Sequence, residues 1–408
     1  MANINMGVNS TNISINDNTS NYNYDQGVTS VSDFIETVSE MLKDIDPSKE
    51  TIFFRGHSDK DYLLVPSLLR THSKNKSKLG HADPNVVNEE HVAFRRIIAQ
   101  QSFEFDGCMS AIEYLVKMQH YGLFTRLLDI TSNPLIALYF ACANPSRDIK
   151  SKVGEVVVLK VPNEFVKYYD SDTISAVANI AKCKASDFEF SLCGEDDNKY
   201  DNFLKGLGYK EEQTTYDRYV NGKKSATSLL GTVSNKLQSC SLDDCNEILE
   251  EGEYKSWFNC QLGYLHHQIK GEKSYYEKII HPYDLGKVWA VQVKMDNPRI
   301  VNQRGAFLIF GLGLTEKEAD NGQIRLFYSK DRYPLIPGTL KNGDADGEGW
   351  IAGRIKIGGQ DSAKEDKKHL IEELKRLGVH HSFVFPDLEN FAKEINETLL
   401  KGTSKNNK

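Results

Sequence analysis

Short β-prone runs lie near both ends of the chain, and helical patterns fill most of the sequence between them. The β-prone runs are residues 51–54, 154–159, 288–293, 306–310, 323–328, 351–357 and 382–385. Strands and helices that alternate in this uneven way are typical of an α+β domain. We therefore predict a mixed sheet flanked by helices, with residues 171–270 as a helical insertion because strand signals are scarce there.

The two ends of the chain have the composition of flexible tails. Residues 1–30 consist mainly of Asn, Ser, Thr and Gly, and residues 401–408 are rich in Lys and Asn. Such segments bury little apolar surface, so they order poorly. We expect a disordered tail at 1–30, one folded domain over 31–400 with a motif core at about 48–160, and a flexible tail at 401–408.

Several helices have recognisable beginnings and ends. Ser32 precedes apolar residues at helical spacing and is a candidate N-cap. Asn133 and Pro134 favour the start of a helix that is apolar on nearly every side. Gly122 and Gly378 follow helical patterns and are candidates for left-handed helix ends.

The composition excludes several classes of protein. There are 50 basic and 57 acidic residues, which gives a net charge of −7 and argues against broad nucleic-acid binding. No run approaches the roughly 20 apolar residues of a membrane-spanning helix, and no secretion signal is evident. Seven cysteines do not suggest a disulfide framework. We expect a cytoplasmic protein that does not bind membranes.

Familiar catalytic and metal-binding motifs are absent from the sequence. It contains no phosphate-binding P-loop, no His-Glu-x-x-His helix and no Gly-x-Ser-x-Gly elbow. The pair Gly311 and Gly313 lacks the third glycine of a dinucleotide fingerprint. The His266–His267 and His380–His381 doublets lack partners at metal-ligand spacing, so we predict no metal site.

The first group of informative residues is Phe54, Arg55, Gly56 and His57, at the end of a predicted strand. A guanidinium that projects from the rim of a sheet can bind a carboxylate or a phosphate. Gly56 would let a ligand or another backbone approach closely. The alternative is a buried ion pair in which Arg55 fastens the strand.

The second group lies in residues 119–129, which we expect to connect two helices. Its polar members are Gln119, His120, Tyr121, Thr125, Arg126 and Asp129. His120 is suited to proton transfer, and Asp129 can orient Arg126 or Arg55. The alternative is a buried polar network that fastens the two helices together.

The third group is the polar stretch from Asn297 to Phe307, which runs into a predicted strand. Gln303 can contact an amide or a ribose hydroxyl of a ligand.

These segments together resemble the FRG domain family of bacteria and phages, named for its Phe-Arg-Gly motif. The resemblance is carried by residues 54–56, 119–122, 125–129, 133–140 and 299–307, and it extends from about residue 33 to 395. Phe124 stands where proline is usual and Ile130 where tryptophan is common, so the local turn differs. The family is largely uncharacterised, and its settings imply conflict between bacteria and phages.

A weaker similarity concerns the first motif alone. A strand that ends in aromatic-Arg-Gly is similar to the first motif of Arg-type mono-ADP-ribosyltransferases, in which the arginine holds the phosphates of NAD. This resemblance implies that Arg55 holds phosphate and makes NAD a candidate cofactor, while the residues themselves leave the cofactor open. The Gln303-Arg304-Gly305 segment lacks the catalytic glutamate of those enzymes.

Three hypotheses remain open. In the first, the protein is an enzyme that binds NAD or another nucleotide and transfers or hydrolyses a ribosyl group, with His120 and Asp129 as catalytic residues. Its ligand-binding residues would be Arg55, Gly56, Gln119, Tyr121, Thr125, Arg126 and Gln303. In the second, the protein is a non-catalytic recognition or regulatory module that binds a protein partner through residues 171–270. In the third, all these polar residues are structural.

Overall fold

The computed structural model describes residues 27–70, 80–143, 152–188, 262–277, 280, 282–318, 324–339, 349–392 and 395–396. Its centre is a seven-stranded mixed sheet. In sheet order the strands are β4 (Val166–Tyr168), β5 (Val288–Gln292), β6 (Gly305–Phe310), β2 (Leu127–Thr131), β1 (Glu50–His57), β3 (Gly154–Pro162) and β9 (Ile351–Ile357). Strands β4 and β5 are parallel, and all other neighbours are antiparallel. The sheet and its flanking helices confirm the predicted α+β class.

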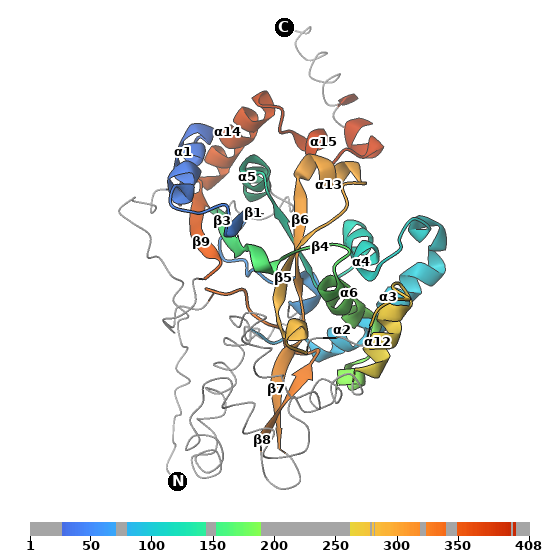
Figure 1. Cartoon of the computed structure of the whole chain (residues 1–408). Coiled ribbons are helices and arrows are strands. Elements are labelled where there is room, and N and C mark those ends of the chain that lie inside the picture. Colours follow the sequence, from blue (N-terminus) through green and yellow to red (C-terminus); the bar gives the residue numbers. More distant parts are fainter. Residues whose placement is uncertain are drawn as a thin grey trace, which may run out of the picture.

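Three helices cover one face of the β1, β3 and β9 part of the sheet (Figure 1). They are α1 (Val31–Leu42), α5 (Pro134–Cys142) and α14 (Ala363–Arg376). Alternate strand residues point towards them, because neighbouring side chains of a strand face opposite sides. Phe54, Val156 and Ile355 thus share a core with Leu138 of α5 and Leu370 of α14.

The second core lies between the sheet and the remaining helices. Phe53 and Val157 face this side, and they belong to one apolar cluster with Met118, Val177 and Ile269. The helices concerned are α3 (Glu90–Gln100), α4 (Ala111–His120), α6 (Asp172–Asn179) and α12 (Gly263–Lys270). Smaller elements complete the fold: α2 (Pro84–Asn88), α13 (Pro298–Gln303), α15 (His381–Val384) and the hairpin of β7 (Gly313–Glu318) with β8 (Ile324–Ser329).

Local chemistry explains the elements that the sequence predicted correctly. The Asn133 side chain accepts a hydrogen bond of 2.9 Å from the backbone N–H of Leu135 and caps α5. Gly122 and Gly378 both have φ of 85°, a left-handed conformation that glycine adopts without a Cβ clash. The strands predicted at 51–54, 154–159, 288–293, 306–310, 323–328 and 351–357 are all present, with small shifts of their ends.

Two errors concern the candidate site. Residues 127–131 are strand β2 in the middle of the sheet, whereas the sequence suggested a connector between helices. This strand has only five residues, and Asp129 interrupts its apolar run. Strand β1 also continues through His57, so Arg55 lies within the strand and not at its rim.

Two other differences between prediction and structure lie outside the candidate site. Residues 381–384 form helix α15, where a strand was expected. Ser30, and not Ser32, caps α1 by accepting a hydrogen bond of 3.1 Å from the N–H of Asp33.

The predicted tails and insertion are only partly within the described residues. Residues 1–26, 189–261 and 401–408 lie outside them. The described ends of the 171–270 segment include α6 and α12, whose buried Val177 and Ile269 pack into the core of the sheet.

Helix α5 packs directly against the backbone of Gly56 on β1. A Cβ added at Gly56 would lie 1.9 Å from the carbonyl oxygen of Ala137.

We expect Gly56→Ala to lower the free energy of unfolding by about 3 kcal/mol, because backbone atoms cannot yield easily. Urea denaturation measures this loss. The matched control is Gly107→Ala, whose added Cβ meets nothing within 4 Å, and an equal effect of both changes would contradict the packing role of Gly56.

Candidate functional site

Arg55 connects the two central strands β1 and β2. These strands share a single register pair, Phe54 with Thr131, whereas β1 pairs with β3 along its whole length. The Nη1 of Arg55 donates a 2.5 Å hydrogen bond to the backbone oxygen of Asp129. It also lies 3.9 Å from the carboxylate Oδ2 of Asp129. The guanidinium therefore links two strands that backbone bonds scarcely join.

His57 holds the Nε side of the Arg55 guanidinium. The Nε of Arg55 donates a 2.9 Å hydrogen bond to Nε2 of His57, so the neutral ring carries its proton on Nδ1. Burial, together with the charges of Arg55, Arg354 and Arg70, lowers the pKa of His57 to about 2, which keeps the ring neutral. Burial also lowers the pKa of Arg55 to about 10, against the opposing charge of Asp129. Arg55 therefore remains a cation at neutral pH, while its Nη2 has no hydrogen-bond partner among the described residues.

Asp129 lies on β2 with 62% of its side chain exposed. Its Oδ2 accepts a 2.8 Å hydrogen bond from Nε2 of Gln119, at the end of α4. The Oε1 of Gln119 accepts in turn from the hydroxyl of Thr125. The structure thus brings together four predicted site residues: Arg55, Gln119, Thr125 and Asp129.

Two further arginines, which the sequence analysis did not single out as site residues, lie within electrostatic reach of Asp129. Partial desolvation lowers the pKa of Arg70, and the charge of Asp129 opposes that shift. Burial lowers the pKa of Arg299, while the negative charges of Asp129 and Asp387 oppose that shift. Among the described residues, Arg70 uses only Nε in a hydrogen bond, to the carbonyl oxygen of Val65 at 2.9 Å.

The guanidinium of Arg299 is held by an aromatic ring. Its Cζ lies 4.8 Å from the centroid of the Phe385 ring, a cation–π contact. Gln303 supports this arrangement, since its Nε2 donates a 3.0 Å hydrogen bond to the carbonyl oxygen of Val384 and ties α13 to α15. The side-chain amide of Gln303, which we predicted to contact a ligand, thus already donates a hydrogen bond to the backbone.

His120 lies at the end of α4, near Arg299. Burial and the charges of Arg299 and Lys117 lower the pKa of His120, and Asp387 opposes them. The imidazole is therefore mainly neutral at neutral pH and able to accept a proton. Its neighbour Tyr121 is 60% exposed and donates a 3.1 Å hydrogen bond to Oε2 of Glu104.

Arg126 makes its contacts elsewhere and is 1% exposed. Its Nε and Nη2 donate to the two carboxylate oxygens of Glu90, at 2.8 and 2.5 Å. Its Nη1 donates to the carbonyl oxygen of Phe310 at 2.9 Å. This forked geometry is a buried ion pair, so Arg126 fits the structural alternative that the sequence left open.

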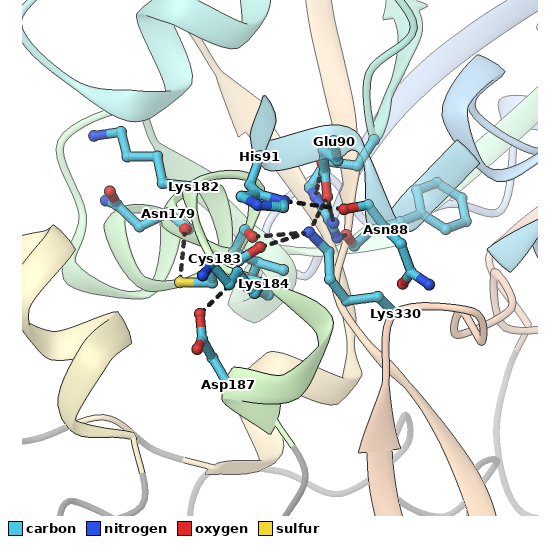
Figure 2. Close-up of polar contacts among 12 residues, drawn as sticks. Asn88, Glu90, His91, Asn179, Lys182, Cys183, Lys184, Asp187 and Lys330 are labelled. Atoms are coloured by element: carbon cyan, nitrogen blue, oxygen red, sulfur yellow. Dashed lines mark hydrogen bonds and ion pairs between the residues drawn. The ribbon is translucent and has the colours of Figure 1, made fainter. Parts of the chain in front are cut away.

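Lys330 completes the buried cluster around Glu90. Figure 2 shows Lys330 between Glu90 and the segment that carries Cys183. The Nζ of Lys330 lies 2.6 Å from Oε2 of Glu90 and donates to the carbonyl oxygen of Cys183 at 3.0 Å. Burial alone would raise the pKa of Glu90, but the charges of Arg126 and Lys330 outweigh it and lower the pKa to about 2.

Sequence reasoning missed Arg70, Arg299, His57 and Asp387 as neighbours of the site. Arg299 lies in the third polar group, and His57 follows Arg55 directly, so a signal existed for both. Arg70 had none, because a single arginine after an apolar run is common at surfaces. The described residues contain no group of three His, Cys, Asp or Glu side chains that could hold a metal ion.

Residues 50–150 match the family model of the FRG domain. The chain contains an FRG domain. The matched segment includes β1, α4, β2 and α5, and therefore Arg55, Gln119, His120 and Asp129. Arg299, on α13, lies beyond the matched residues.

No curated protein and no solved structure matches the sequence. None of the helices in the described part of the chain is long and apolar enough to cross a membrane.

The buried cluster around Glu90 leads to a stability prediction. Glu90→Gln leaves two buried cations without their carboxylate, so we expect a loss of about 4 kcal/mol in unfolding free energy at pH 7. Glu89→Gln is the matched control, since Glu89 is exposed. Chemical denaturation of both variants measures the difference, and equal stability would contradict the structural role of the cluster.

The loss of stability caused by Glu90→Gln should depend on pH. A carboxyl whose pKa is lower in the folded state stabilises the fold fully above its unfolded value, here 4.5, and loses that contribution as the pH falls towards about 2. The stability difference between the intact protein and Glu90→Gln should therefore shrink over that range.

Proposed function

We propose that the FRG domain binds a phosphorylated, nucleotide-type ligand at the guanidinium groups of Arg55, Arg70 and Arg299, with NAD as the first candidate. In this proposal the protein then transfers or hydrolyses the ribosyl group. It would act as an effector in conflict between bacteria and phages, the setting that the family resemblance implies.

The observation that carries the proposal is the set of guanidinium donors without partners. Nη2 of Arg55, both terminal nitrogens of Arg70 and all nitrogens of Arg299 have no hydrogen-bond partner among the described residues. Phosphate oxygens suit such donors in both charge and geometry. The three arginines face two carboxylates, Asp129 and Asp387, so a positive charge remains for an anion.

Arg55 is preorganised for this role. His57 and the backbone of Asp129 hold its Nε and Nη1, which leaves the Nη2 edge in a fixed position. A fixed donor loses less conformational entropy when it binds a ligand. The similarity of Phe54-Arg55-Gly56 to the first motif of Arg-type mono-ADP-ribosyltransferases supports a phosphate at Arg55.

Two groups near the arginines are suited to ribosyl chemistry. A carboxylate such as Asp129 can stabilise the positive charge that develops on a ribose when its glycosidic bond breaks. The neutral imidazole of His120 can accept the proton of an attacking water or acceptor.

Isothermal titration calorimetry with NAD tests the binding step. We expect Arg70→Gln to weaken NAD binding at least about tenfold, because a charged donor is lost while the neighbouring fold is kept. Arg96→Ala is the control, since Arg96 is exposed on α3. Melting temperatures of all variants exclude unfolding as the cause.

Release of nicotinamide from NAD tests the chemical step in the same samples. We expect release by the intact protein and none by Asp129→Asn. Absence of NAD binding to the intact protein would contradict the proposal of an NAD site. Binding without release would contradict the enzymatic part.

A further inference from the structure

Asp129 is an exposed residue whose carboxylate is nevertheless held in place. An exposed aspartate usually samples several rotamers, because water satisfies its oxygens in each of them. Here Gln119 donates a 2.8 Å hydrogen bond to Oδ2, and Nη1 of Arg55 lies 3.9 Å from the same oxygen. One carboxylate oxygen is thus anchored from two sides.

Thr125 fixes the amide that anchors Asp129. The Oγ1 of Thr125 accepts a 3.2 Å hydrogen bond from the N–H of Leu127 and donates its own proton to Oε1 of Gln119. A flipped amide would place Oε1 against the carboxylate of Asp129, which is repulsive. Because Thr125 is 1% exposed, its hydroxyl is shielded from competing water and keeps the Gln119 amide in this orientation.

The second oxygen of Asp129, Oδ1, has no hydrogen-bond partner among the described residues. A carboxylate oxygen only accepts hydrogen bonds, so a ligand must offer it a donor. Arg55 contacts both the backbone and the carboxylate of Asp129, so a phosphate on Arg55 would lie near this oxygen. In nucleotides the hydroxyl groups of the sugar are donors only a few bonds away from a phosphate.

We propose that Thr125 and Gln119 are positioning residues that hold Oδ1 of Asp129 towards a sugar hydroxyl of the ligand. This inference rests on the proposed function and narrows its substrate class to ribonucleotides with a free 2′- or 3′-hydroxyl. Simple phosphates and dideoxynucleotides would use the arginines alone.

The test compares three ligands by calorimetry: pyrophosphate, ADP and 2′,3′-dideoxy-ADP. The affinity for pyrophosphate measures the contribution of the arginines. The ratio of the dissociation constants of the two nucleotides measures the contribution of the hydroxyl contact. For the intact protein we expect ADP to bind about tenfold more tightly than the dideoxy compound, the size of one hydrogen bond to a charged group. Gln119→Met and Thr125→Val should abolish this ratio and leave pyrophosphate binding within about twofold, while Thr125→Ser should restore it.

The outcomes separate this inference from the proposed function. Equal binding of ADP and its dideoxy analogue to the intact protein overturns the inference alone, provided that pyrophosphate binds. A parallel loss of all three ligands in both variants also overturns it, because that pattern indicates a merely structural role. Failure of the intact protein to bind any of the three overturns both proposals. If Thr125→Val does not fold, Gln119→Met decides.

Discussion

The arrangement of the site depends on the link that Arg55 makes between β1 and β2. These central strands pair at one register position only, and the arginine donates to the Asp129 backbone where the ladder has ended. The same side chain is held by neutral His57 and lies beside the Asp129 carboxylate. One guanidinium thereby joins the two strands, and in the proposed site its Nη2 would contact the ligand. Fold and candidate function share this residue, so its replacement would disturb both.

The protein uses its arginines in two distinct ways. Each guanidinium nitrogen of Arg126 donates a hydrogen bond inside the core, either to the Glu90 carboxylate or to a backbone carbonyl. Arg70 and Arg299 keep terminal nitrogens without described partners, and the carboxylates that act on their charge are Asp129 for both and Asp387 for Arg299. The difference follows from the available acceptors, since a buried guanidinium must be paired whereas one in contact with water need not be.

The sequence predicted what local chemistry determines. Asn133 and Pro134 indicated α5, and the apolar residues that follow indicated its burial. Strand β2 was missed because Asp129 lies in the middle of five residues, and its partner strands are distant in the sequence. For the same reason Arg126 and Arg55 looked equivalent, although Glu90 pairs with Arg126 and Lys330, and Arg55 lies beside Asp129. The density of polar groups in 119–129 was informative, but their division into core and site required the fold.

In the proposed site Arg55, Arg70 and Arg299 face a phosphorylated ligand, whereas Arg126 does not. Nuclear magnetic resonance of the arginine side chains, with ¹⁵N at Nε, observes each guanidinium separately during a titration with pyrophosphate. We expect the signals of Arg55, Arg70 and Arg299 to shift together and saturate, and the signal of Arg126 to stay in place. Unchanged signals for all four arginines, or a shift of Arg126 alone, would contradict it.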